Sequence, residues 1–189
     1  MRIGVLSGTF DPVHCGHVAF AMAAIRQCGL DKVIFLPERS PRGKVGVSNF
    51  EHRLSMLKLA VRQSNKLDVV ASDEQRFTVQ QTLPALQAQF KYASLVLLCG
   101  SDLVRTFGFR WPGLETLLAQ CELAVGLRAG ESQADLEVFL SSLAIEPRLT
   151  FVEGLNTHLS ATQVRAGNLG GIDPLVRAYI EANQLYQTA

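Results

Sequence analysis

The sequence has little net charge, few cysteines and no long apolar run. Its 18 lysines and arginines nearly balance 17 aspartates and glutamates, and the net charge of +1 argues against a chain that coats nucleic acid through bulk electrostatics. The four cysteines are far apart and form no C-x-x-C pair, which excludes the dense disulfide framework of a small secreted domain. No stretch approaches the roughly 18 consecutive apolar residues of a membrane span. We therefore expect a cytoplasmic protein that binds neither nucleic acid nor membrane.

What the sequence does have is enough apolar material for a sizeable core. Hydrophobic residues occupy 48% of its positions and charged residues 19%, which is typical of a globular protein and excludes disorder. At roughly 150 residues per domain, this length predicts one domain. That domain is expected to span residues 1–189.

Short apolar runs alternate along the chain with segments of helical spacing. We expect strands at 3–7, 32–36, 67–71, 94–99, 122–127 and 149–152, and helices at 18–28, 48–62, 80–90, 114–120, 134–143, 161–166 and 174–183. This alternation predicts a doubly wound, Rossmann-like α/β fold on a parallel sheet. Ser48 to Glu51 has the pattern of a capping box at the start of the second helix. Two segments rich in Gly, Pro and Arg, 38–47 and 103–113, are expected to be mobile loops.

The turn after the first strand carries two histidines three residues apart, where a helix is expected to begin. At that spacing His14 and His17 share one helix face, and the helix N-terminus offers N–H groups and a partial positive charge to a phosphate. The segment is neither a Walker loop nor a G-x-G-x-x-G turn. Taken alone, the pair is also compatible with ordinary capping histidines, or with two of the three or four ligands of a metal site.

A second pattern lies near the other end of the chain, from His158 to Arg165. Ser160 or Thr162 is placed to cap the helix that follows, and Arg165 lies one turn inside that helix. Alone, this is a capped helix with a solvated arginine. Combined with the histidine turn in a doubly wound sheet, it supplies a second helix N-terminus and a guanidinium for a polyphosphate.

The two patterns together resemble those of a known family. Residues 8–17 are similar to the H-x-G-H signature of the nucleotidyltransferase superfamily, and residues 160–165 to its S-x-T-x-x-R signature. Within the superfamily, essentially the whole chain resembles bacterial nicotinate-nucleotide adenylyltransferases. The resemblance implies a single domain of the nucleotidyltransferase type, whose C-terminal helices, at about 160–189, carry the second phosphate-binding motif. It also implies transfer of AMP from ATP to the phosphate of nicotinate mononucleotide, with release of pyrophosphate and with Mg²⁺ bound to ATP.

The resemblance assigns roles to residues of this chain. His14, His17 and Arg165 are expected to be catalytic. ATP is expected to contact Gly8, Thr9, Phe10, His14, His17, Gly100, Asp102, Ser160, Thr162 and Arg165, and the acceptor to contact Lys44, Thr82 and Trp111. No metal-ligating residue is expected, because a Mg²⁺ that bridges a triphosphate stays largely hydrated.

The departures from the family pattern fall on the acceptor side. A Pro-Pro-His-Lys type of loop is replaced by the histidine-free loop 37–44, and the segments 77–83 and 109–113 are each one residue longer than in the family. Phe77 and Trp111 are candidates to stack on a pyridine ring, with core or loop-anchoring aromatics as the alternative. The acceptor phosphate is assigned to the cations of the loop, with a solvated basic loop as the alternative: Arg39, Arg42 and Lys44.

Three other functions stay open at this point. One is transfer to a different phosphorylated acceptor, such as nicotinamide mononucleotide. Another is a non-catalytic nucleotide-binding paralogue, and the third is a metal-dependent hydrolase that uses His14 and His17. Homo-oligomerisation is also open.

Overall fold

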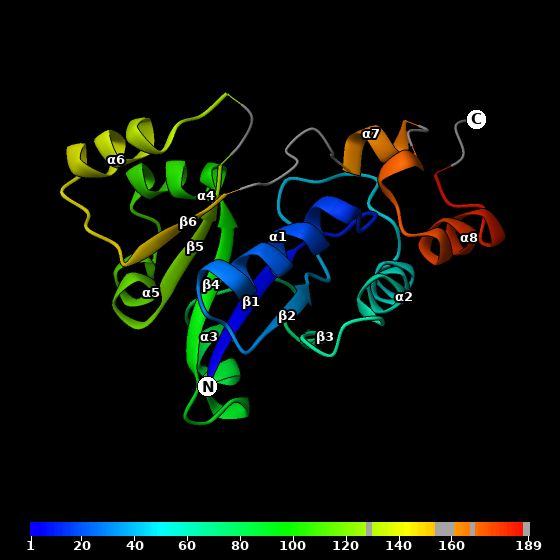
Figure 1. Ribbon diagram of the computed structural model, residues 1–189, viewed down its shortest axis with the longest axis horizontal. Coiled ribbons are helices and arrows are strands. Elements are labelled where there is room, and N and C mark those ends of the chain that lie inside the picture. Colours follow the sequence, from blue (N-terminus) through cyan, green and yellow to red (C-terminus); the bar gives the residue numbers. More distant parts are fainter. Residues whose placement is uncertain (128–129, 154–160, 167–168, 187–189) are drawn as a thin grey trace.

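The computed structural model describes residues 1–127, 130–153, 161–166 and 169–186. Within this part of the chain one parallel sheet contains β1 (Arg2–Gly8), β2 (Lys32–Pro37), β3 (Leu67–Val69), β4 (Ser94–Gly100), β5 (Glu122–Gly126) and β6 (Leu149–Val152). The strand order is β3-β2-β1-β4-β5-β6, so the direction of winding reverses between β1 and β4 (Figure 1). The predicted doubly wound α/β fold is confirmed, and the position of each predicted strand agrees with it.

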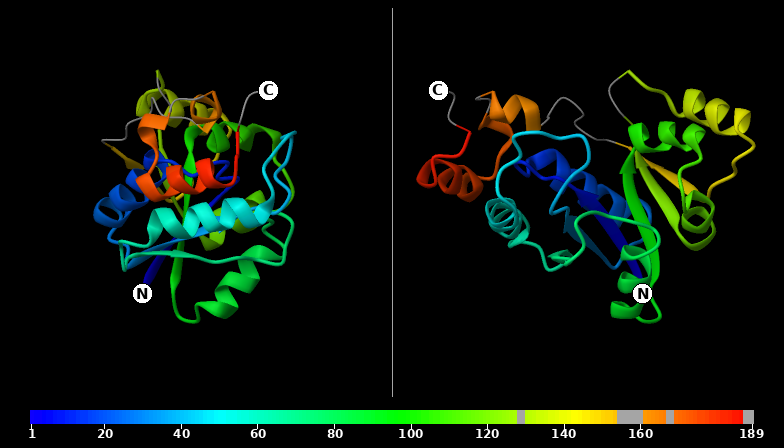
Figure 2. Two further views of the ribbon diagram at one scale, coloured as in Figure 1. Left: turned by 90° about the vertical axis from the view of Figure 1, so that its right-hand side faces the viewer. Right: turned by 180° about the vertical axis from the view of Figure 1, so that it is seen from behind.

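Helices cover both faces of the sheet (Figure 2). The core on one face includes residues of α1 (Cys15–Gln27), α2 (Phe50–Val61), α7 (Ala161–Arg165) and α8 (Pro174–Ala182), and α8 packs against α2. The other face packs against α3 (Thr82–Gln89), α4 (Ser101–Arg105), the 3-10 helix η1 (Thr106–Phe109), α5 (Leu114–Gln120) and α6 (Gln133–Ser142). A further 3-10 helix, η2 (Leu169–Gly171), precedes α8. No helix in the described ranges is both long enough and apolar enough to cross a membrane.

Alternate residues of β1 serve the two faces. Leu6 belongs to the core under α1, whereas Ile3 and Val5 belong to the core under α3 to α6. Gly4 points toward α1, where a Cβ atom would lie 2.7 Å from Val33 Cγ2, so a larger residue would require the neighbouring side chains to shift. By the same alternation Ser7, the last side chain of the strand, points away from α1.

Two local predictions were wrong. The N-cap of α2 is Asn49, whose side chain accepts a hydrogen bond from the Glu51 N–H at 3.2 Å, while the backbone of Ser48 is bound to Asp11. The segment 103–113 is mostly helical, because α4 and η1 occupy 101–109. Val104 and Phe107 are fully buried there, so tertiary packing stabilises turns that have no helical pattern of their own.

Candidate active site

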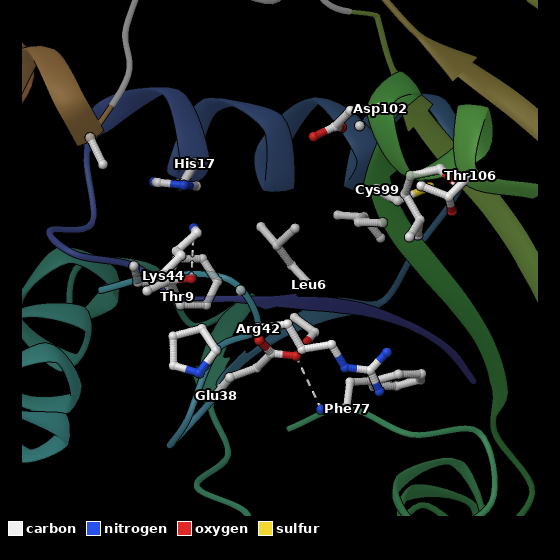
Figure 3. Close-up of a pocket in the computed structure, with 18 of the residues that line it drawn as sticks. Leu6, Thr9, His17, Glu38, Arg42, Lys44, Phe77, Cys99, Asp102 and Thr106 are labelled. Carbon is white, nitrogen blue, oxygen red and sulfur yellow. Dashed lines mark hydrogen bonds between the residues drawn. The ribbon is translucent and has the colours of Figure 1, made fainter. Parts of the chain in front are cut away.

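A cavity of about 1380 Å³ opens at the carboxyl ends of the central strands, where the helices that follow β1 and β4 lie on opposite faces of the sheet. It exceeds the roughly 300–1,000 Å³ of an ordinary small-molecule pocket, so it has room for two substrates. We call the part lined by residues 8–17 and 161–165 the motif half, and the part lined by residues 38–47, 77–80 and 106–112 the loop half. Figure 3 shows His17 and Glu38 on opposite sides of the cavity, with Thr9 and Lys44 between them.

The two histidines of the motif half form one unit. His14 has extended backbone and precedes the first turn of α1, and its N–H donates to Nδ1 of His17 at 3.2 Å. In return the His17 N–H donates to the His14 carbonyl at 3.0 Å, and the ring centroids are 3.8 Å apart. A neutral imidazole that accepts at Nδ1 carries its proton on Nε2. The backbone of His14 therefore sets His17 as a hydrogen-bond donor through Nε2.

The Phe10 ring contacts the ring of His17. Its backbone has a φ of 50°, its side chain is 3% exposed, and its ring meets the His17 ring edge-on with centroids 5.1 Å apart. The Phe10 ring also packs on Phe35, with the ring centroids 5.6 Å apart. Phe10 also lines the cavity, and its ring contact restrains the plane of the His17 imidazole.

The C-terminal motif is bonded directly to the N-terminal one. Arg165 donates through Nη1 to the carbonyl of Asp11 at 2.5 Å and through Nη2 to Thr162 Oγ1 at 3.2 Å. These contacts bring α7 against the histidine turn across 154 positions of sequence. Thr162 and Arg165 both line the cavity, while Ser160 lies outside the described residues.

The remaining predicted ATP residues also lie in the cavity wall. Gly8 ends β1, and Gly100 ends β4 and precedes α4, whose first turn contains Asp102. Thr9 Oγ1 accepts a hydrogen bond from Lys44 Nζ at 2.8 Å. The structure thus places together nine of the ten predicted ATP residues, and all nine line the cavity: Gly8, Thr9, Phe10, His14, His17, Gly100, Asp102, Thr162 and Arg165.

Four of the predicted acceptor residues line the loop half: Arg42, Lys44, Phe77 and Trp111. Trp111 is anchored because its Nε1–H donates to Thr106 Oγ1 at 3.1 Å and its ring meets Phe107 edge-on. The indole is therefore held at the wall of the cavity.

Two other predicted acceptor residues are engaged elsewhere. Thr82 is 1% exposed and does not line the cavity; its hydroxyl accepts from the Thr78 N–H at 2.9 Å and donates to a carbonyl. Arg39 stacks on the Phe50 ring at 4.2 Å and donates to the Ser72 carbonyl. Both predictions are corrected, since these side chains stabilise the chain around the loop half and do not reach the cavity.

Sequence reasoning missed Arg53, which holds the two halves together. The guanidinium is 1% exposed, and burial lowers its pKa, an effect opposed chiefly by the charge of Asp11. It donates to four carbonyls, those of Thr9, Glu38, Arg39 and Ser48, at 2.7 to 3.1 Å. An arginine four residues before Leu57, on the apolar face of the helix, was the available signal.

Asp11 is the second residue whose role was missed. It is 4% exposed, and its carboxylate accepts from Tyr186 Oη at 2.6 Å and from the Ser48 N–H at 3.2 Å. Burial, and then the hydrogen bond to Asp11, raise the pKa of Tyr186, which keeps the phenol a donor. Asp11 therefore ties the histidine turn to the start of α2 and to the chain beyond α8. Asp11 lies between the motif residues Phe10 and Pro12, and the sequence pattern there did not indicate a structural role for its carboxylate.

The described ranges contain no group of three or more His, Cys, Asp or Glu side chains arranged to hold a metal ion. Both oxygens of Asp11 are already engaged by donors. The motif half of the cavity wall includes the nitrogen-bearing side chains of His14, His17 and Arg165, which suit phosphate oxygens.

Comparison with known proteins identifies the family. The cytidylyltransferase-like family model matches residues 5–167. A probable nicotinate-nucleotide adenylyltransferase of Neisseria meningitidis is 31% identical over 195 aligned positions, covering 98% of each chain, and one of Rhodopirellula baltica is 33% identical over 88% of this chain and 79% of its own. The fold is similar to that of a nicotinic acid mononucleotide adenylyltransferase of Plasmodium falciparum, solved with NaAD, with a TM-score of 0.78, 17% identity and coverage of 98% and 97%. The chain is a nucleotidyltransferase that belongs to the cytidylyltransferase-like family and, within it, to the nicotinate-nucleotide adenylyltransferases.

Proposed function

We propose that this enzyme transfers AMP from ATP to the 5′-phosphate of nicotinate mononucleotide, in the biosynthesis of NAD. The observation that carries the proposal is the hydrogen bond from Arg165 to Asp11, which joins two phosphate-binding motifs at one cavity. The same contact supports the view that residues 1–189 act as one functional unit. The names of the relatives support the choice of acceptor.

The proposed reaction does not require a nucleophile from the protein. An oxygen of the acceptor phosphate attacks the α-phosphorus of ATP, and the bond from that phosphorus to the oxygen bridging to the β-phosphate breaks. Pyrophosphate leaves with the electron pair. Because the acceptor brings its own nucleophile, catalysis rests on alignment and on stabilising the charge of the transition state.

The motif half supplies those charges and donors. His17 presents Nε2–H, oriented by His14 and Phe10, and α1 presents the N–H groups of its first turn to the phosphates. The Arg165 guanidinium offers a positive charge, and Thr162 lies beside it. We assign the β- and γ-phosphates to this side, with Ser160 as a further donor, and Gly100 and Asp102 to the ribose.

Mg²⁺ is assigned to the substrate MgATP, and the described residues suit that arrangement because they offer no cluster of three ligands. A Mg²⁺ that keeps most of its waters needs few protein oxygens, and it supplies neutralisation of the charge on the leaving pyrophosphate.

The loop half is assigned to the acceptor. Trp111 and Phe77 provide aromatic surface for a pyridine ring, and Arg42 and Lys44 provide charge for its phosphate. A reducing, cytoplasmic setting is part of the proposal, and it is supported by four cysteines that are all free: Cys15, Cys28, Cys99 and Cys121.

The test is pyrophosphate release with ATP and Mg²⁺, measured with nicotinate mononucleotide and with nicotinamide mononucleotide side by side. Turnover on the nicotinate form is the expected result. ATP binding without pyrophosphate release on either acceptor would contradict the proposal.

A further inference from the structure

The segment that follows α8 returns to the histidine turn. The helix ends at Ala182, and the backbone is left-handed at Gln184, with a φ of 51°, and at Tyr186, with a φ of 60°. The Leu185 N–H donates to the Ile180 carbonyl at 3.0 Å, and the side chains of Leu185 and Tyr186 pack against the core under α1. A bulky residue rarely adopts left-handed backbone, and it does so where its surroundings hold it. The position of the Tyr186 ring is therefore set by tertiary contacts.

The Tyr186 phenol bonds the Asp11 carboxylate. Its Oη donates to Asp11 Oδ1 at 2.6 Å, across 175 positions of sequence. Asp11 is 4% exposed, and the other carboxylate oxygen accepts from the Ser48 N–H at 3.2 Å. A hydrogen bond to a buried charged group is stronger than one between neutral groups. The phenol is thus a firm anchor for the Asp11 side chain.

The backbone of Asp11 carries the contact between the two phosphate-binding motifs. Its carbonyl accepts from Arg165 Nη1, while Arg165 Nη2 donates to Thr162. Burial and the bond to Asp11 raise the pKa of the Tyr186 phenol, and the charge of Arg165 opposes that rise, so the guanidinium lies near the ring. Arg165 lines the cavity, whereas Tyr186 does not. Tyr186 therefore acts on the cavity through Asp11 and not by touching a ligand.

Asp11 also belongs to the turn that carries the histidines. Phe10, the residue before it, contacts the His17 ring, and His14 follows three residues after Asp11. A displacement of Asp11 consequently moves the residues that orient His17 and the carbonyl that holds Arg165. Small displacements of this kind weaken catalysis and binding, because the donors must lie within a fraction of an ångström of their positions.

On the basis of the phosphate assignment in the proposed function, we propose that Tyr186 is a positioning residue for the triphosphate of ATP. Its phenol fixes Asp11, and Asp11 fixes the Arg165 guanidinium and the histidine turn against one another. The bond from the Ser48 N–H to Asp11 remains when the phenol is removed, so the loop half keeps its geometry. Tyr186 therefore determines the affinity for ATP and leaves the affinity for the acceptor unchanged.

The experiment removes only the phenol hydroxyl, in Tyr186→Phe. Calorimetry measures the Kd of α,β-methylene-ATP with Mg²⁺, an analogue that cannot transfer AMP, and pyrophosphate release at saturating MgATP measures KM for nicotinate mononucleotide. We expect the Kd of the analogue to rise about tenfold, near the lower end of the effect of losing a hydrogen bond to a charged group. KM for the acceptor should stay within about twofold of the wild type. A protein that is merely less stable has fewer folded molecules of the same affinity, so it does not give this result.

The matched control is Tyr179→Phe. The Tyr179 hydroxyl bonds His52 Nδ1 at 3.0 Å, so this variant also loses one hydrogen bond between the C-terminal part of the chain and α2, and neither residue lines the cavity. The Kd of the analogue should be unchanged in Tyr179→Phe. Thermal unfolding of both variants checks that they are folded at the temperature of the assay.

The outcomes separate this inference from the function on which it rests. A Kd that is unchanged in Tyr186→Phe, or that rises equally in the control, overturns the role of Tyr186. So does a rise in KM for the acceptor as large as the rise in Kd. Wild-type protein that binds the analogue but releases no pyrophosphate with nicotinate mononucleotide overturns the proposed acceptor, and the Kd values still decide the role of Tyr186.

Discussion

The two halves of the cavity are held in place in different ways. In the motif half, functional side chains are fixed by contacts within or between two short segments, as when the His14 backbone orients His17 and Arg165 binds the Asp11 carbonyl. In the loop half, many polar side chains are engaged in the loops themselves, as Thr82 and Arg39 show. The bonded side chains of the motif half therefore line the cavity, whereas Thr82 and Arg39 stabilise the loops and do not line it.

Substitution of Arg53, which joins the two halves, is expected to have the largest effect on stability. Arg53→Met removes the donors of four carbonyls, so we expect the free energy of unfolding to fall by about 3 kcal/mol or more. Urea unfolding measures this. Arg62→Met removes an exposed arginine that bonds Asp173, and it should cost about 1 kcal/mol or less. Equal losses in both variants would mean that Arg53 is not the link between the halves.

His17→Ala tests the motif half. Loss of one oriented donor to transition-state charge typically lowers turnover about 10²–10³-fold, and we expect a loss of that order in kcat with folding unaffected. An assay of pyrophosphate release measures kcat, and thermal unfolding measures the stability of the variant. His52→Ala is the control, since His52 contacts Tyr179 on α8 and does not line the cavity. Near-normal turnover of His17→Ala would remove His17 from the mechanism.

Arg165→Lys asks whether the forked guanidinium is needed. A lysine keeps the charge but cannot hold both the Asp11 carbonyl and Thr162, so we expect kcat/KM for ATP to fall roughly 10-fold to 100-fold. The control is Arg177→Lys, which alters an exposed pair with Glu181. Wild-type kinetics in Arg165→Lys would make Arg165 a surface residue.

The smallest expected change in activity is at Thr82. Thr82→Val leaves the Thr78 N–H without its acceptor, so stability should drop by about 1–3 kcal/mol while KM for the acceptor stays within about twofold. Thr116→Val, at an exposed position of α5, should change neither. A large rise in KM at unchanged stability would restore Thr82 to the acceptor site and weaken the contrast between the halves.

The fold was predictable because its signals are local and repeated. Buried strands such as β4 are apolar at successive positions, and the turns between elements carry Gly, Pro or capping residues. The short helices α4 and η1 were not predictable in this way. Their stability comes from the burial of Val104 and Phe107 against distant parts of the chain.

The same distinction explains the site. The described residues of the two motifs were accessible to sequence reasoning because motif spacing and helix geometry determine one another, as at His14 and His17. Asp11 and Arg53 escaped notice because their partners, Tyr186 and the carbonyl of Glu38 among them, are far away in sequence or belong to the backbone. Every residue has a backbone carbonyl, so the residue type does not reveal which carbonyl accepts a hydrogen bond.

The central claim is that the bond broken lies between the α- and β-phosphates of ATP. The most direct test supplies ATP labelled either at the α- or at the γ-phosphate, together with Mg²⁺ and nicotinate mononucleotide, and separates the products. The account predicts that the α-label enters a dinucleotide and that the γ-label appears in pyrophosphate. Transfer of the γ-label to the mononucleotide, or release of the α-label as free AMP or ADP with no dinucleotide, would contradict it.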